Sequence, residues 1–187
     1  MSAKTRRFVP RLESFDDRIV PAVMITQFDT IVVIEGDDAP DQFAIFDDGS
    51  AGGVVVKDAA GQTIFTGSGT ITNIVVNTGG GNDVVDYWLT NTLTVDRTLS
   101  LDLGRKNDTF AAHLSGRTLG AGAELFISAH SQMGNDHLIL DAQGVNSEAG
   151  ARLAVDYSGG KGKDTVDISF SRGDMWFGQP EQISGVA

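Results

Sequence analysis

Apolar and polar residues alternate along most of the chain, and the alternation repeats in a fixed relation to four aspartates. These are Asp83, Asp108, Asp136 and Asp164, which lie 25, 28 and 28 residues apart. Alternating apolar residues on both sides of each aspartate predict two half-buried strands per repeat, joined by a turn. The positions nine before and two after the aspartates are occupied by Ile74, Leu99, Ile127, Val155, Val85, Phe110, Leu138 and Val166.

This repeat predicts an all-β fold, a parallel β-solenoid of about five coils with a repeat of about 28 residues. A single repeat of this length cannot bury its own apolar face, so neighbouring coils must stack on one another. The same template fits around Asp41, which supplies the first of the five copies. The alternative interpretation is a β-sandwich on which the period arises by chance.

The step from Asp41 to Asp83 is 42 residues, longer than the later steps. Its excess consists of short β-rich runs separated by Gly and Asp clusters, which is typical of hairpins. We therefore expect an N-terminal hairpin flap, inserted over about residues 44–70. The long step also predicts that Asp41 shares no site with Asp83. Residues 90–95 and 120–126 are expected to form a third strand or a bulged corner.

Both ends of the chain depart from the repeat. Residues 1–23 are rich in Arg and carry two of the four Pro. They lack the 7–15-residue apolar stretch of a secretory signal, and their composition alone indicates a disordered or weakly helical tail. The β-solenoid domain is predicted over 24–187. Within it, residues 170–187 are expected to cap the last coil with Trp176 and Phe177.

Composition narrows the classes of partner. The formal net charge is −11, and Asp supplies 20 of the 25 acidic residues, a bias typical of turns. An acidic chain argues against nucleic acid and anionic membranes and is compatible with metal cations. No apolar run approaches the ~20 residues of a membrane span. The chain has no Cys, which excludes a disulfide framework.

The turns of the repeat carry a known calcium motif. The segment GGKGKDTVD (159–167) matches the nonapeptide G-G-x-G-x-D-x-U-x, where U is apolar, and TGGGNDVVD (78–86) misses only its first Gly. This pattern resembles the calcium-binding repeat of the RTX family. The resemblance implies left-handed glycine turns and Ca²⁺ held between stacked coils by aspartates and turn carbonyls. The metal ligands that it implies are Asp83, Asp108, Asp136, Asp164, Gly159 and Gly162.

Two other interpretations of these turns remain open. Each coil carries one nonapeptide, whereas the family repeats run in tandem. Two of the turns contain cations, which can neutralise a row of aspartates without a metal: Arg105, Lys106, Lys161 and Lys163. The turns can also be purely structural, with a hydrogen-bonded ladder formed by Asn82, Asn107 and Asn135. If calcium binds, the adjacent turns at Asp136 and Asp164 are expected to form the strongest site.

The N-terminal segment resembles a second family. Residues 6–22, RRFVPRLESFDDRIVPA, resemble the R-P-R-L-E-x-L-E-D-R-x-V-P-A segment of planctomycete surface and exported proteins. The sequence departs from that pattern at Phe15 and Asp16. The resemblance implies export or display at the cell surface and implies no activity. The matching residues are Pro10, Arg11, Leu12, Glu13, Asp17, Arg18, Val20, Pro21 and Ala22.

Taken together, these features predict a non-enzymatic exported or cell-surface structural or adhesion module, stabilised by calcium. Its expected partners are extracellular matrix, a glycan or further copies of itself. The alternative is a carbohydrate-active or carbohydrate-binding β-solenoid that uses the carboxylate pairs Asp83/Asp86 and Asp164/Asp167. An aromatic row beside a carboxylate groove would favour this alternative. The sequence contains no nucleophile elbow, phosphate loop or zinc-ligand spacing.

Overall fold

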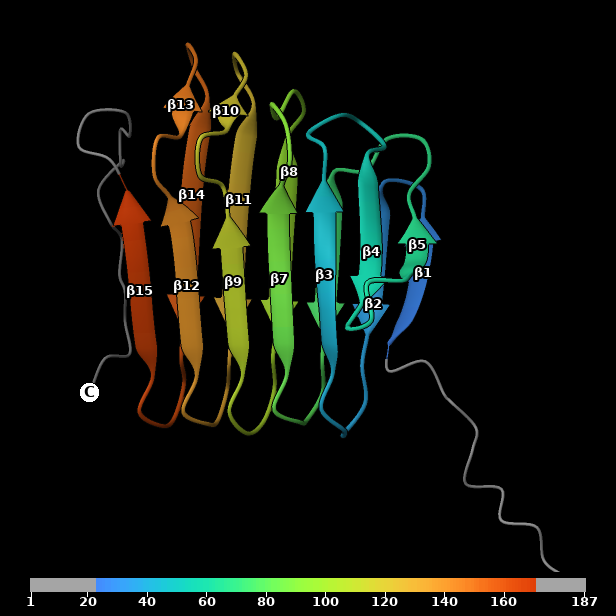
Figure 1. Ribbon diagram of the computed structural model, residues 1–187, viewed down its shortest axis with the longest axis vertical. Coiled ribbons are helices and arrows are strands. Elements are labelled where there is room, and N and C mark those ends of the chain that lie inside the picture. The colour runs from blue at the N-terminus through green and yellow to red at the C-terminus, as the bar shows by residue number, and fades with distance from the viewer. Residues whose placement is uncertain (1–22, 171–187) are drawn as a thin grey trace, which may run out of the picture.

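The computed structural model describes residues 23–170, which form a β-solenoid of two facing sheets without helices (Figure 1). In spatial order, the first sheet contains β1 (Met24–Phe28), β2 (Ile31–Glu35), β6 (Asn73–Asn77), β8 (Arg97–Asp102), β11 (Glu124–His130) and β14 (Arg152–Ser158). The second sheet contains β15 (Thr165–Phe170), β12 (His137–Ala142), β9 (Thr109–His113), β7 (Val84–Leu89), β3 (Gln42–Asp47), β4 (Val54–Asp58) and β5 (Thr63–Thr66).

The chain passes from a strand of the first sheet, through an aspartate turn, to a strand of the second sheet. Five such strand pairs stack in parallel, which makes about four full turns. In the last two coils the register joins residues 28 apart, as in Ile127 with Val155 and Leu138 with Val166. The predicted parallel β-solenoid is therefore confirmed, and its five sequence copies correspond to the five strand pairs.

Antiparallel strands close the N-terminal end of the described solenoid. β1 pairs with β2, while β4 and β5 extend the second sheet from β3 as two hairpins. The hairpin insertion predicted over about 44–70 is thus confirmed. Because β4 and β5 are added beyond β3, β3 remains free to pair directly with β7.

A short third ladder lies at the upper edge in Figure 1. β10 (Thr118–Leu119) pairs in parallel with β13 (Asn146–Ser147), and Leu93 bridges to Leu119. Residues 90–95 form no strand of their own and contribute only the single bridge of Leu93 to this ladder. The segment 120–126 instead supplies a turn and the first residues of β11, because its apolar residues continue the alternation of that strand.

The core lies between the two sheets and consists of the alternate side chains that point inward. Ile74, Leu99 and Ile127 stack in the first sheet and are fully buried. Val85 and Phe110 stack in the second sheet and are buried as well. The predicted apolar stacks are therefore confirmed in every coil but the last.

We expect truncation of a central core residue to be costly. Leu138 is 2% exposed and lies between Phe110 and Val166 in the inner row. Leu138→Ala should lower the free energy of unfolding by about 2–5 kcal/mol, measured by urea denaturation. Ile139→Ala, on the outer face of the same strand, is the control and should cost less than half as much. Equal losses for the two variants would contradict the register.

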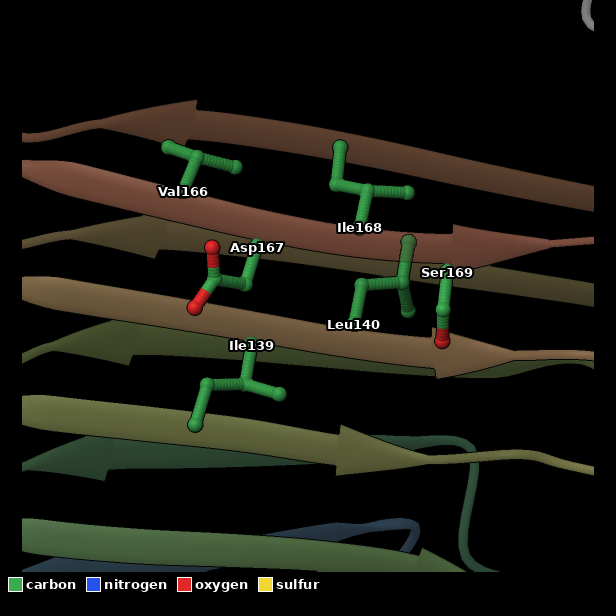
Figure 2. Close-up of a pocket in the computed structure, with 6 residues that line it drawn as sticks. All are labelled: Ile139, Leu140, Val166, Asp167, Ile168 and Ser169. Atoms are coloured by element: carbon green, nitrogen blue, oxygen red, sulfur yellow. The ribbon is translucent and has the colours of Figure 1, made fainter.

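The last coil is less well covered than the coils before it. Leu140 is 2% exposed, whereas its register partner Ile168 is 40% exposed. Figure 2 shows these side chains and their neighbours Val166 and Ser169 along β12 and β15, where they line a hollow of about 340 Å³. After Phe170, the cap predicted over 170–187 lies outside the described residues. Residues 1–22 of the N-terminal tail, which contain the segment resembling planctomycete proteins, also lie outside them.

Candidate cation site at the aspartate turns

The predicted aspartates form one continuous ladder of hydrogen bonds. The turns that carry them lead into the strands of the second sheet along the lower edge of the solenoid in Figure 1. Each aspartate follows a turn and stands immediately before a strand of the second sheet. Its Oδ1 accepts the backbone N–H of the aspartate in the preceding coil. Asp83 N–H donates to Asp108 (2.9 Å), Asp108 N–H to Asp136 (2.8 Å) and Asp136 N–H to Asp164 (3.0 Å). The structure thus brings all four predicted aspartates together.

Asp41 also belongs to this ladder, so the prediction that the long step separates it from Asp83 is wrong. Its backbone N–H donates to Oδ1 of Asp83 at 2.8 Å, and the residue is 1% exposed. The physical reason is that the extra residues leave the coil as β4 and β5. The turn itself keeps its position relative to the next coil.

The carboxylates of the ladder are buried, apart from the half-buried Asp164 of the last coil, and each has one oxygen without a hydrogen-bond partner. Asp83, Asp108 and Asp136 are at most 1% exposed, and one oxygen of each accepts the bond described above. Their second oxygen, Oδ2, is buried without a hydrogen-bond partner, as are Oδ2 of Asp164 and Oδ1 of Asp41. Buried charge of this kind requires a neutralising proton or cation.

Burial raises the pKa of the Asp41, Asp83, Asp108 and Asp136 carboxyls. Desolvation is the largest cause at each of them, and it raises the pKa of Asp41 and Asp136 to about 6 and that of Asp108 to about 7. The neighbouring carboxylates of the ladder add to the rise at Asp108, while the Lys106 ammonium and the backbone hydrogen bond oppose it. The pKa of Asp83 is raised in the same direction. Asp41, Asp108 and Asp136 therefore lose their protons at about pH 6 to 7, well above the usual range of an aspartate.

The glycines of the turns are required by close packing. Gly104 has a φ of 77°, in the left-handed region, and a Cβ there would collide with the carbonyl of Gly79. Of the two predicted glycine ligands, Gly159 packs against the Asp164 carboxylate and Gly162 against the Gly134 carbonyl. The expected left-handed turns are thus present.

The ladder fits calcium only as a weak site. Calcium takes six to eight oxygen ligands, and two adjacent coils offer it one spare carboxylate oxygen each. The remaining ligands would be turn carbonyls. Within residues 23–170 no group of three or more His, Asp or Glu side chains is placed to hold a metal ion. Calcium binding by Asp83, Asp108, Asp136, Asp164, Gly159 and Gly162 stays a prediction, with the strongest site expected at the turns of Asp136 and Asp164.

A second ladder runs beside the first on the outside of the turns. Asn82 Oδ1 accepts the N–H of Asn107 (3.1 Å), Asn107 Oδ1 that of Asn135 (2.8 Å), and Asn135 Oδ1 that of Lys163 (2.9 Å). The expected asparagine ladder is confirmed. Its bonds run in the opposite direction to those of the aspartates, because here the preceding coil supplies the side-chain acceptor.

Aromatic rings form a row on the outer face of the second sheet. Trp88 stacks on His113 with ring centroids 3.7 Å apart and lies parallel to Phe46 at 6.4 Å. Asp86 Oδ1 lies 3.2 Å from His113 Nε2, and the Lys57 ammonium lies over the Phe46 ring. The rings of Trp88 and His113 therefore cover each other's faces. A sugar ring that stacked on either of them would need such a face to be free. A hollow of about 210 Å³ adjoins the row between Phe46, Lys57 and Asp86.

The carboxylate pairs considered for glycan cleavage are divided between two environments. Asp83 is buried in the ladder, whereas Asp86 is on the outer face beside His113. Likewise Asp167 is an exposed partner of His137, at 2.9 Å, whereas Asp164 accepts the Asp136 N–H in the ladder. Neither pair presents two carboxylates on a common solvent-facing surface.

Sequence reasoning missed a buried polar cluster near the N-terminal hairpins. Asp47 accepts hydrogen bonds from Arg97 Nε at 2.7 Å, Arg97 Nη2 at 3.1 Å and the Tyr87 hydroxyl at 2.9 Å. The side chains of Asp47 and Arg97 are fully buried. The signal was present in the alternation, since Asp47 stands two residues after inward Ile45 and Arg97 two before inward Leu99.

No known family, curated protein or solved structure matches this chain in sequence or structure comparisons. A helix long and apolar enough to cross a membrane does not occur between residues 23 and 170.

Proposed function

We propose that this protein is a non-enzymatic structural or adhesion module, exported or held at the cell surface. The supporting observation is the unbroken ladder of turn hydrogen bonds through all five strand pairs, which makes the solenoid a rigid spacer. Export rests on the resemblance of residues 6–22 to planctomycete surface proteins. Extracellular matrix, a glycan or further copies of the chain are its expected partners.

Calcium is the proposed stabilising ion. Asp136 and Asp164 would supply the carboxylate oxygens, together with carbonyls of the turn that contains Gly159 and Gly162. A bound divalent cation would neutralise carboxylates that are otherwise buried without a partner. With so few charged ligands, we expect an affinity no tighter than the ~10⁻⁴–10⁻³ M of extracellular calcium modules.

Thermal melting tests the calcium proposal. Millimolar Ca²⁺ should raise the Tm of the wild-type chain at pH 8 and EDTA should lower it, because a ligand that binds only the folded state stabilises that state. The variant Asp136→Asn/Asp164→Asn should lose the shift. Asp156→Asn/Asp167→Asn removes two exposed carboxylates and should keep it. No calcium-dependent shift in the wild type would contradict the metal and leave a turn-forming ladder.

A carbohydrate-active or carbohydrate-binding module is the second candidate. It is favoured by the hollow between Phe46, Lys57 and Asp86, which places a carboxylate beside an aromatic ring on the outer face of the second sheet. Incubation of the protein with a panel of polysaccharides distinguishes the two candidates. The structural proposal expects retention or self-association without release of reducing ends. Release of reducing ends that disappears in Asp86→Asn would overturn it in favour of an enzyme.

A further inference from the structure

The outer side of the aspartate turns presents hydrogen-bond donors and cations in a protein that is otherwise acidic. In the third coil Arg105 and Lys106 are exposed, and in the fifth Lys161 and Lys163 are exposed. Within residues 23–170, none of these four forms an ion pair with an acidic side chain. Backbone bridges link Arg105 to Met133 and Met133 to Lys161, so the two cations stand two strands apart in one row.

The asparagine ladder adds a second row of donors to this edge. Because Oδ1 of Asn82, Asn107 and Asn135 accepts a backbone N–H from the next coil, each amide leaves its Nδ2 group for other partners. No hydrogen bond among the described residues uses these Nδ2 groups, and all three side chains belong to exposed residues. The backbone ladder therefore fixes which end of each amide is available.

The carboxylates of the same turns do not offset these donors at the surface. Asp108 and Asp136 are buried, with one oxygen bound to a backbone N–H. The nearby Asp102 accepts hydrogen bonds from Gln132 Nε2 at 2.8 Å. Asp37 and Asp38 lie at the first turn, two coils before Arg105. The donor edge thus runs from Asn82 in the turn of the second coil to Lys163 in that of the fifth, and its cations stand in coils three and five.

We propose that this donor edge, formed by Asn82, Asn107, Asn135, Arg105, Lys106, Lys161 and Lys163, binds an anionic polysaccharide carrying sulfate or carboxylate groups. The proposal rests on the adhesion module proposed above and names its partner class. Donors repeat at the strand spacing of ~4.8 Å along a straight edge, which suits a linear polymer better than a compact ligand. Exposed flexible cations bind such polymers through several weak contacts at once.

The rest of the molecule limits what can bind. With a net charge of −11, the surface outside this edge repels polyanions, so binding must be local and sensitive to salt. Nucleic acid is the competing polyanion. The edge offers no aromatic platform for bases and is one turn wide, so it favours a single flexible glycan chain over a duplex.

Calorimetric titration of the full chain at low ionic strength tests the proposal, with heparin and polygalacturonate as probes and neutral dextran as the control ligand. We expect binding to at least one anionic glycan, weakened by added NaCl, and none to dextran. Lys161→Gln/Lys163→Gln should lower the affinity about tenfold, as expected for the loss of two surface contacts. The control variant Arg117→Gln/Arg152→Gln removes the same two positive charges at sites away from the edge. It should lower the affinity for the glycan less than twofold.

Asn135→Asp provides the sharpest variant. It keeps an oxygen to accept the Lys163 N–H and replaces the outward NH₂ donor by an anionic oxygen. Binding should fall at least as far as in the double lysine variant, while the circular dichroism spectrum is unchanged. The donor edge would be overturned if the arginine control lost as much affinity as the lysine variant. It would also be overturned if the protein bound a DNA duplex as tightly as the anionic glycan. If no glycan binds while the chain self-associates, this inference fails and the structural module stands.

Discussion

Substitution of Arg97 should destabilise the protein by about 3–5 kcal/mol, the cost of leaving a buried charge without its partner. In Arg97→Met the Asp47 carboxylate would keep the Tyr87 hydroxyl and the Gly49 N–H but lose both guanidinium bonds. The pair joins β3 to β8, in different sheets, and Arg97 also donates to the Ser50 carbonyl at 2.9 Å. The hairpin insertion would therefore loosen together with the first coil.

Urea denaturation of a double-mutant cycle measures this effect. Asp47→Leu combined with Arg97→Met removes both charges and should recover most of the lost stability, since a buried pair is often replaceable by apolar residues. Tyr87→Phe removes one neutral donor and should cost only about 1–2 kcal/mol. A loss below 1 kcal/mol in Arg97→Met would show that water reaches Asp47, contrary to its complete burial.

The fold could be predicted from sequence because its signal is repeated. The same offset from each aspartate is occupied by Phe110, Leu138 and Val166. Apolar side chains at such equivalent positions can be buried only if the coils stack on one another. The same alternation marks Arg97 and Asp47 as inward. Their pairing was not predictable, because sequence period does not tell which inward positions of two sheets meet.

The membership of the ladder was harder to predict than its existence. Asp41 was excluded because the step to Asp83 is long, yet step length measures only the chain between the turns. Extra residues that leave as a hairpin do not change the register of the coil. The opposite directions of the aspartate and asparagine ladders were also not predictable, since Asn82 and Asp83 are adjacent and both are common turn residues.

The aspartate ladder should make the protein more stable in mild acid than at pH 8. Asp has a pKa near 3.8 when unfolded, and burial raises it to about 6 at Asp41 and Asp136 and to about 7 at Asp108. The folded state therefore binds more protons than the unfolded state between about pH 4 and pH 7. Stability must fall as pH rises through this window. At about 1.4 kcal/mol per pKa unit, the coupled row should lose on the order of 5 kcal/mol between pH 5 and pH 8.

Two variants distinguish the contribution of the ladder to this pH dependence from that of the general charge repulsion in a chain of net charge −11. Asp108→Asn keeps an oxygen to accept the Asp83 N–H and carries no charge, so it should exceed the wild type in stability at pH 8 and match it near pH 4.5. Asp156→Asn removes an exposed charge and should leave the pH dependence steep. The measurement is the urea midpoint across this range, in EDTA to exclude cations. A wild type that is most stable at pH 8 would mean that the buried carboxylates are neutralised by something other than protons.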